Sequence, residues 1–245
     1  MKNTAIVVYS HSSYSDAWAM FIGQIDKYFG KDIAKYIICD DWSEQIPDDW
    51  KCVIYDDQLD YAKRVANCLE SVEEEFCIFH HEDMPLYKQP DLEKIEKYNK
   101  ILDENDDISY IKLVRGGLYE DIKEQKAHEK SETLYELMPD HYFIFAVQPS
   151  MWKTKDLKRV YKTCKIQHIR EFELVATEIC KYFKVKGLYH FGGENKRGLY
   201  HWDSDIYPYI ATAIVKGKWN ISEYNKELIP LVEEYNVDVY KRGIV

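Results

Sequence analysis

The chain has 245 residues, a length that allows one large domain or two small ones with a full core. Of these residues 46% are hydrophobic and 31% are charged, as in ordinary globular proteins. Its formal net charge of −10 argues against a nucleic-acid backbone as the main partner, because binding phosphates requires clustered Lys and Arg. The amino terminus enters a strand-like segment directly and no apolar stretch approaches bilayer length, so neither a signal peptide nor a transmembrane segment is expected.

Cysteine and tyrosine usage adds two weaker indications. The cysteines show no CxxC spacing and mostly lie in apolar runs, which is typical of reduced, buried thiols, so we expect a cytoplasmic protein. The 21 tyrosines carry rings with polar edges that suit sugars and nucleobases, although tyrosine is also a common strand residue. The cysteines are Cys39, Cys52, Cys68, Cys77, Cys164 and Cys180.

Predicted strands and helices alternate along the first 115 residues. This alternation predicts an α/β fold with a mostly parallel central sheet and helices on both faces. No linker is recognisable, so residues 1–245 are treated as a single domain with a C-terminal elaboration. Strands are predicted over residues 4–9, 35–39, 52–55, 76–79 and 108–114, and helices over residues 18–29, 59–72 and about 91–103.

The second half of the chain gives a less regular pattern. Residues 116–140 are highly charged and lack an apolar stripe. This pattern is typical of a mobile lid or of a solvent-exposed loop, and the exposed loop is favoured. The apolar segment 141–148 is predicted to be a strand, after which Pro149 to Trp152 turns into a helix. Further helices are predicted around residues 172–183 and 222–235.

The stretch that follows the fourth predicted strand is the strongest candidate for chemistry. An apolar run over residues 76–79 breaks into His80-His81-Glu82-Asp83, which is typical of a buried strand whose carboxyl end opens onto solvent. Because strand side chains alternate, His81 and Asp83 should point one way and Glu82 the other. An imidazole beside a carboxylate can bind Mn²⁺ or Mg²⁺, but a polar turn after a strand is the simpler interpretation.

Acidic pairs also end two neighbouring strands. Asp40-Asp41 follows the second strand and Asp56-Asp57 follows the third. One such pair alone is typical of a solvent-exposed turn. Its repetition at neighbouring strand ends favours one polar rim at the ligand-binding edge of the sheet.

A second polar segment covers residues 189–205. It combines three glycines with His190, Lys196, Arg197 and His201. Flexible backbone and positive charge would suit a loop that closes on a metal-bound diphosphate, whereas the alternative is a surface hairpin with incidental histidines. The chain has no GxGxxG after its first strand, no P-loop and no GxSxG, which disfavours a Rossmann dinucleotide site, a P-loop nucleotidase and an α/β-hydrolase.

This pattern resembles the nucleotide-diphospho-sugar transferases of the GT-A fold. The features that carry the similarity are a first strand ending in small polar residues, a second ending in Asp40, a Tyr-Asp-Asp strand end before a helix with Arg64, and His81-Glu82-Asp83 in place of the family's DxD motif. The similarity covers the N-terminal half and, more loosely, the rest. It implies that residues 1–115 bind the nucleotide-sugar and residues 140–245 form the acceptor side.

The resemblance also implies individual roles. The donor-binding residues would be Tyr9, Ser10, His11, Asp40, Asp56, Asp57, Arg64, His81, Glu82, Lys196 and Arg197, with residues 195–202 covering the diphosphate. The ligands of Mn²⁺ or Mg²⁺ would be Asp83 and His81, with His190 and His201 as candidates for a C-terminal histidine. The segment 170–173 resembles the acidic stretch that supplies the base of inverting members, which makes Glu173 the first candidate and Glu171 the second; both also suit helix capping.

These features predict a glycosyltransferase that moves a sugar from a UDP- or GDP-sugar to a hydroxyl of a glycan or another acceptor. A divalent cation with Lys196 or Arg197 would stabilise the departing nucleoside diphosphate, and a carboxylate would take the acceptor proton. Two alternatives stay open. One is a metal-dependent nucleotidyltransferase or hydrolase that uses the same carboxylates, and the other is a non-catalytic sugar- or nucleotide-binding domain.

Overall fold

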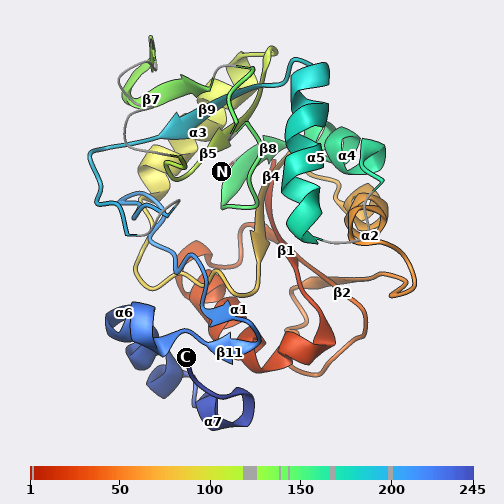
Figure 1. Ribbon diagram of the computed structural model, residues 1–245, viewed down its shortest axis with the longest axis vertical. Helices are drawn as coiled ribbons and strands as arrows, with labels where there is room; N and C mark the ends of the chain where they lie inside the picture. Colours follow the sequence, from red (N-terminus) through yellow and green to blue (C-terminus); the bar gives the residue numbers. More distant parts are fainter. Residues whose placement is uncertain (2, 118–125, 138, 143, 166–168, 198–200) are drawn as a thin grey trace.

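The computed structural model describes residues 1, 3–117, 126–137, 139–142, 144–165, 169–197 and 201–245, and at residues 169 and 170 it describes the backbone only. Within these residues a nine-stranded sheet forms the centre, in the order β3-β2-β1-β4-β8-β5-β9-β7-β6 (Figure 1). The strands are β1 (Thr4–Tyr9), β2 (Ala34–Cys39), β3 (Lys51–Ile54), β4 (Phe76–His81), β5 (Ile108–Lys112), β6 (Ala127–His128), β7 (Ser131–Leu137), β8 (Ser150–Lys153) and β9 (Lys186–His190).

The strands that end at the predicted rim are parallel neighbours. β1 lies between β2 and β4 and is parallel to both, with Tyr9 opposite Ile38 on one side and His81 on the other. β3 extends this parallel set beyond β2. Every residue of β1 and β4 is buried, because each side chain of a central strand meets a packed layer. The carboxyl ends of all four strands therefore lie along one edge.

Helices cover both faces of the sheet, and each face has its own apolar core (Figure 1). α1 (Ser15–Phe29) and α3 (Leu92–Glu104) pack on one face, and α2 (Tyr61–Cys68), α4 (Thr154–Thr163) and α5 (Ile169–Tyr182) pack on the other. This arrangement confirms the predicted α/β fold with a mostly parallel sheet flanked by helices. No helix in the described part of the chain is long and apolar enough to cross a membrane.

A strand was expected at residues 141–148, but the strand of this region, β8, begins later in the chain. It lies between β4 and β5 and is antiparallel to both. The described residues of 141–148 have no strand structure, although Ile144 and Phe145 are buried. The paired residues begin directly after Pro149, which has no N–H to donate to a sheet. Apolar character thus identified burial in this segment but not the strand itself.

The charged segment 116–140 contains strands β6 and β7, whereas the sequence suggested a lid or a solvent-exposed loop. β7 pairs with β9, a strand that the sequence analysis did not assign. Leu134 and Leu137 are the buried residues of β7, so its apolar alternation is short and easily lost among charged neighbours. Residues 118–125 and 138 lie outside the described part of the chain.

The C-terminal segment packs against the chain that follows β4. It comprises the hairpin β10 (Ile214–Val215) and β11 (Lys218–Trp219) and the helices α6 (Ile221–Glu234) and α7 (Val239–Arg242), which lie near α1 in Figure 1. The Ala213 N–H donates to the Asp83 carbonyl at 2.8 Å, and the Ile210 N–H donates to the Pro85 carbonyl at 2.9 Å. The last quarter of the sequence therefore holds the predicted metal-binding stretch in place.

Candidate functional site

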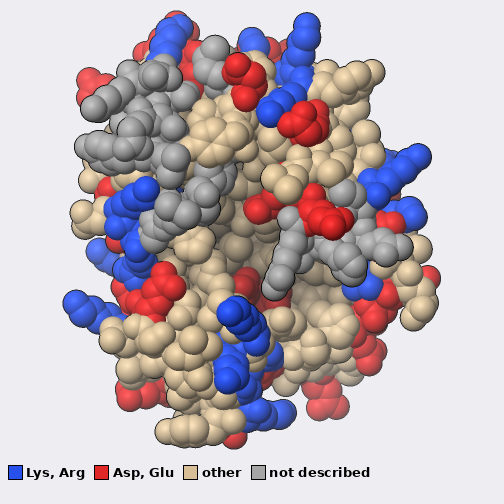
Figure 2. Space-filling model, in the orientation of Figure 1, with Lys and Arg blue, Asp and Glu red and all other residues tan. Residues whose placement is uncertain are grey.

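Polar residues from four neighbouring parallel strands meet at one edge of the sheet. Ser10 follows β1, Asp40 follows β2, Asp57 follows β3 and Glu82 follows β4. The face in Figure 2 is hollowed near its middle, over the region of β4 and β8 in Figure 1, with acidic side chains inside the hollow and basic ones along its lower border. A concave surface with both signs of charge suits a small polar ligand.

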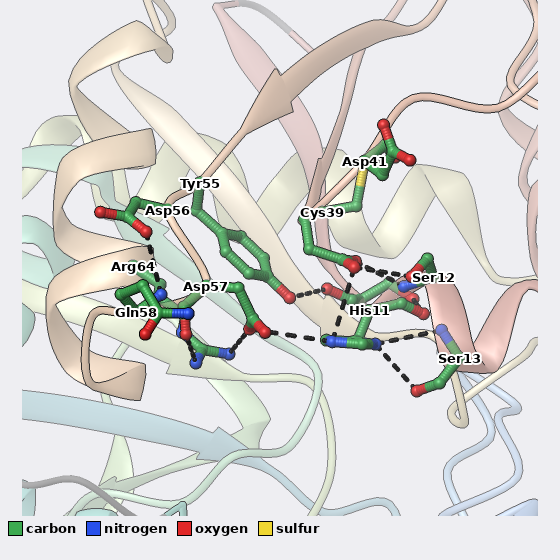
Figure 3. A network of polar contacts seen from close by, with 12 residues as sticks. His11, Ser12, Ser13, Cys39, Asp41, Tyr55, Asp56, Asp57, Gln58 and Arg64 are labelled. Atoms are coloured by element: carbon green, nitrogen blue, oxygen red, sulfur yellow. Dashed lines mark hydrogen bonds and ion pairs between the residues drawn. The ribbon is translucent and has the colours of Figure 1, made fainter.

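A chain of polar contacts joins the ends of β1, β2 and β3 (Figure 3). Asp40 accepts hydrogen bonds from the Ser12 N–H at 2.5 Å and from the Ser12 hydroxyl at 2.6 Å. His11 Nε2 lies 3.5 Å from the Asp40 carboxylate and 3.7 Å from that of Asp57, which is 2.7 Å from Arg64 Nη1. The structure thus brings together four residues predicted to bind the donor, and it adds Ser12.

The Asp40 carboxyl is held in its charged form. Its partial burial would raise the pKa of this group, but the hydrogen bonds from Ser12, a backbone hydrogen bond and the charge of His11 together lower it. An ionised carboxylate at this position can accept a hydrogen bond from an N–H or O–H donor of a ligand.

Two tyrosines form an aromatic platform beside these charges. The rings of Tyr9 and Tyr55 stack with centroids 5.4 Å apart, and the Arg64 guanidinium lies 5.1 Å from the centroid of Tyr55. The Tyr55 hydroxyl donates to the Ser10 carbonyl at 2.9 Å, which fixes the turn after β1. Tyr9 and Ser10 are among the predicted donor-binding residues, whereas Tyr55 was predicted only to end a strand.

The loop between β3 and α2 positions Arg64. The guanidinium donates to the Leu59 carbonyl at 2.7 Å and to the Asp57 carbonyl at 2.5 Å. Asp56, a predicted donor-binding residue, instead accepts from the Gln58 N–H at 2.9 Å within an exposed turn. Asp57 and Arg64 therefore belong to the network, and Asp56 shapes the loop that carries them.

The side chains at the end of β4 diverge into different surroundings. His81 Nε2 lies 2.9 Å from the Tyr61 hydroxyl, among the rings of the α2 side of the sheet. His80 lies 2.5 Å from the Tyr207 hydroxyl on the α1 side. Burial lowers the pKa of His81 to about 4 and that of His80 to about 3, so both imidazoles are neutral at pH 7. The structure places His81 within packed aromatic side chains.

Glu82 and Asp83 are adjacent carboxyl groups in a poorly solvated position. Burial and the charge of Asp83 raise the pKa of Glu82, while Ser10 and Arg242 act in the opposite direction. Burial raises the pKa of Asp83 to about 7. Crowded carboxyl oxygens with raised pKa values are a donor set that fits a hard divalent cation, because such an ion would favour ionisation of both groups.

Glu173, the first candidate for a catalytic base, lies at the start of α5. Its Oε1 accepts a hydrogen bond from the Val147 N–H at 2.6 Å. Burial lowers the pKa of Lys112 to about 8, and the charge of Glu173 opposes this shift. Burial also lowers the pKa of His201, and the charges of Glu223 and Glu173 oppose that shift. Glu173 therefore lies within electrostatic range of Lys112 and His201. Glu171 is exposed in the first turn of the same helix.

The loop after β9 is arranged differently from the expectation that it closes on a diphosphate. Arg197 is 3.1 Å from Asp203 and 2.6 Å from Glu227, so its charge is already balanced. The Lys196 ammonium lies 5.7 Å from the ring centroid of Trp202. Residues 198–200, the middle of the predicted diphosphate cover, lie outside the described part of the chain.

His190 meets two acids that the sequence analysis did not single out. Its Nε2 lies 2.7 Å from Glu194 Oε1 and 2.6 Å from Asp205 Oδ1. Among the described residues, these three form the group of potential metal ligands whose donor atoms all lie within 4.8 Å of one another, and Asp83 is not part of it. The structure thus brings His190 together with Glu194 and Asp205.

Arg242 is another residue that sequence reasoning missed. It donates through Nε to Asp16 at 2.9 Å and through Nη2 to the Ser13 carbonyl at 2.7 Å, and its charge acts on Glu82. Asp16 and Arg242 are 226 positions apart, and no local pattern connects them. Only the docking of the C-terminal segment brings this cation to the strand ends.

Comparisons with known proteins show what this chain is similar to. No protein-family model and no curated protein matches its sequence. TarS from S. aureus shares the fold with a TM-score of 0.53 at 12% identity, over 97% of this chain and 40% of that chain. TarS 1-349 in complex with UDP gives a TM-score of 0.51 at 12% identity, over 97% of this chain and 66% of that chain.

A cytidylyltransferase from Leptospira borgpetersenii serovar Hardjo-bovis gives a TM-score of 0.50 at 10% identity, and the match covers 100% of both chains. This chain spans less than half the length of the full TarS structure but the whole length of the cytidylyltransferase. At such low identity the likeness concerns the fold alone. The fold is GT-A-like, in agreement with the sequence-based expectation.

Proposed function

We propose that this protein is a glycosyltransferase that moves a sugar from a nucleoside-diphosphate donor to an acceptor hydroxyl. The observation that carries the proposal is the network of His11, Asp40, Asp57 and Arg64 at the ends of three parallel strands. Its fixed acceptors and guanidinium can recognise the base and ribose of a nucleotide, and the Tyr9–Tyr55 pair supplies an aromatic wall. The structural likeness to TarS in complex with UDP supports the same assignment.

In this proposal the two halves of the chain have different tasks. Residues 1–115 hold the nucleotide and its sugar, with Ser10 and Ser12 contributing from the turn after β1. Residues 140–245 provide the acceptor side, where the charge of Glu173 acts on Lys112 and His201. Lys196 adds positive charge in the loop after β9, whereas Arg197 acts mainly by holding that loop.

The carboxyl groups of Asp83 and Glu82 would hold the divalent cation. Mn²⁺ or Mg²⁺ bound there would offset the charge that develops on the departing nucleoside diphosphate. His81 would shape the site through Tyr61, because its Nε2 is engaged with that hydroxyl. The charge of Arg242 favours the ionised form of Glu82.

The proton of the acceptor hydroxyl would pass to Glu173. The Val147 N–H fixes the Glu173 carboxylate through Oε1, and Oε2 would take the proton. Glu171, in the first turn of α5, is the second candidate for this role. Attack of the acceptor oxygen on the anomeric carbon would then form the new glycosidic bond as the bond to the diphosphate breaks, with inversion.

A nucleotidyltransferase is the second candidate, because the Leptospira cytidylyltransferase matches this chain over its whole length. The two reactions release different products. A glycosyltransferase releases a nucleoside diphosphate from a nucleotide-sugar, whereas a nucleotidyltransferase releases pyrophosphate from a nucleoside triphosphate. A product assay therefore separates them.

The deciding experiment offers the purified protein a panel of nucleotide-sugars and, separately, of nucleoside triphosphates with sugar phosphates or sugar acids, each with and without Mn²⁺. We expect slow, metal-stimulated release of UDP or GDP from one nucleotide-sugar and thermal stabilisation by the same nucleotide. Release of pyrophosphate instead would establish the nucleotidyltransferase. Stabilisation by a nucleotide with neither product would establish a binding domain.

The variant Asp83→Asn tests the cation. We expect it to fold normally and to lose the metal-dependent part of nucleotide binding, because it removes one charged ligand. Asp48→Asn, which neutralises an exposed acid elsewhere on the surface, is the matched control. Equal metal dependence in Asp83→Asn and in the unmodified protein would exclude Asp83 as a ligand.

A further inference from the structure

A second cluster with metal-binding character lies at the end of β9, separate from the Asp83 carboxyl. Its centre is the imidazole of His190, which is completely buried. Glu194 Oε1 and Asp205 Oδ1 approach the same ring nitrogen, Nε2, at 2.7 Å and 2.6 Å. The donor atoms of the three side chains all lie within 4.8 Å of one another, which is close enough for one ion to contact each of them.

The other nitrogen of His190 has the kind of partner that metal-bound histidines have. Its Nδ1 lies 2.8 Å from the hydroxyl of Tyr98 on α3, and that hydroxyl is 2.9 Å from Thr133 Oγ1. An imidazole that donates its Nδ1–H to a fixed oxygen presents the lone pair of Nε2 to a metal. When the Tyr98 hydroxyl donates to Thr133 and accepts from the Nδ1–H, His190 has the tautomer and the ring orientation that metal binding needs.

Gly192 leaves space at the centre of the cluster. A Cβ atom at this position would lie 3.3 Å from Asp205 Oδ2, 3.5 Å from Glu194 Oε1 and 3.6 Å from His190 Nε2. The absent side chain would point at all three ligands together. The Gly192 N–H also donates to Glu194 Oε2 at 2.7 Å, which holds that carboxylate in place.

A simple ion pair satisfies this cluster poorly. Nε2 carries at most one proton, yet two carboxylate oxygens lie within hydrogen-bond distance of it. A divalent cation would balance both negative charges and leave the imidazole neutral. Glu194 and Asp205 also line a cavity of about 260 Å³ together with Tyr87 and Ser204, which gives solvent access to the remaining coordination positions.

We infer that His190, Glu194 and Asp205 form a binding site for a divalent transition-metal ion, of the Zn²⁺ or Mn²⁺ class. One imidazole nitrogen and two carboxylate oxygens favour such ions over Mg²⁺ and Ca²⁺, which prefer oxygen ligands alone. The ion would tie the loop after β9 to the end of that strand, because its ligands come from both ends of residues 190–205. This site is independent of the proposed transferase chemistry.

The test titrates the chelator-treated full chain with Zn²⁺, Mn²⁺ and Mg²⁺ by calorimetry, and with Co²⁺ by visible absorption. We expect one transition-metal ion to bind per chain in addition to any ion held at Asp83, and Mg²⁺ to compete weakly. Asp205→Asn should weaken this binding by at least about tenfold, since even an outer-shell partner of a metal ligand is worth that much. Asp205 carries the test because it is partly exposed, whereas replacing the buried His190 could disturb the fold.

Two further variants sharpen the result. Gly192→Ala keeps all three ligands but fills the space between them, so it should weaken metal binding as well. Asp203→Asn, which neutralises a neighbouring acid paired with Arg197, is the matched control and should leave the affinity unchanged. Unfolding curves recorded without metal would show that each variant is folded.

Absence of saturable Zn²⁺, Mn²⁺ and Co²⁺ binding would overturn the inference. So would equal affinity in Asp205→Asn and in the unmodified protein, or loss of all binding in Asp83→Asn alone, which would assign the ion to the strand end. Nucleotide binding measured on the same preparations reports on the proposed function separately.

Discussion

His80 and His81 are consecutive residues of β4, and they enter opposite cores of the molecule. The ring of His80 packs edge-on against Phe21 and contacts the Tyr207 hydroxyl, and that of His81 contacts Tyr61. The two rings point to opposite faces of the sheet because strand side chains alternate, but the chemistry of His81 was not visible in the sequence. The sequence around a polar residue at a strand end is the same whether its side chain faces solvent or an aromatic cluster. Here the packing of α2 places His81 in an aromatic cluster.

The burial of His80 predicts a loss of stability in acid. An unfolded histidine takes up a proton near pH 6.5, whereas burial lowers the pKa of His80 in the folded protein to about 3. Between these values the unfolded state binds more protons, so the free energy of unfolding decreases as pH falls, by at most about 1.4 kcal/mol per pH unit for this group.

The measurement is urea unfolding at pH values spaced through that window. His80→Gln keeps a hydrogen-bonding group beside Tyr207 but removes the titration, so its stability should fall less steeply with pH. Identical pH slopes for the two proteins would mean that His80 does not titrate as its surroundings imply. His128, which is not fully buried, is the matched site for a control substitution to Gln.

Glu173 carries the residue-scale prediction about catalysis. Glu173→Gln retains an oxygen for the Val147 N–H but cannot take a proton, so turnover should fall by about 100-fold or more while the affinity for the nucleotide is kept. Glu178→Gln, an exposed acid of the same helix paired with Lys181, is the control. Unchanged turnover in Glu173→Gln would transfer the role to Glu171 or argue against an inverting reaction.

At the scale of elements, the sequence predicted the parallel half of the sheet better than the antiparallel half. Strands β1 to β4 are apolar runs closed by polar residues, and local pattern is sufficient for such strands. β8 has four residues, and β7 alternates weakly because it lies near the sheet edge. Their pairing depends on contacts with β4, β5 and β9, which are distant in sequence.

The contact between β5 and β9 gives a prediction about one glycine. A Cβ on Gly187 would overlap the ring of Tyr110, which is buried and stacks on Trp152 at 4.1 Å. This ring has no room to move, so Gly187→Ala should lower the free energy of unfolding by about 1–3 kcal/mol.

Gly23→Ala is the matched comparison, because its Cβ would overlap the ring of Tyr235. Tyr235 is only partly buried and can shift, and alanine favours the helix that contains Gly23 by roughly 0.5–1 kcal/mol. Denaturant unfolding of both variants should therefore show a clearly larger loss for Gly187→Ala. Equal losses would mean that the Tyr110 ring relaxes as easily as the surface one.

At the scale of the whole molecule, the candidate site depends on both ends of the chain. The gathering of polar residues at the ends of β1, β2 and β3 was largely predictable, because strand ends in parallel sheets converge by topology. The role of the C-terminal segment was not, because Ala213 reaches Asp83 and Arg242 reaches Asp16 only after the fold has formed. Contacts between such distant positions leave no periodic or local signature in a single sequence.

Arg242 allows this dependence to be measured. Its guanidinium pairs with Asp16, donates to the Ser13 carbonyl and lies 4.6 Å from the ring centroid of Tyr14, and its charge favours the ionised form of Glu82. Arg242→Met keeps most of the apolar side chain but removes this charge. We expect a loss of stability of about 1–3 kcal/mol, because Asp16 remains partly buried without a partner.

The same substitution should also weaken metal-dependent nucleotide binding, since the pKa of Glu82 would rise further without the Arg242 charge. Lys241→Met, at an exposed position of the same short helix, should change neither quantity. Chemical unfolding and nucleotide titration with and without Mn²⁺ measure both effects on the same samples. A stability loss with unchanged binding would limit Arg242 to holding the C-terminal segment, whereas a combined loss would show that this segment sets the charge of the strand-end carboxylates.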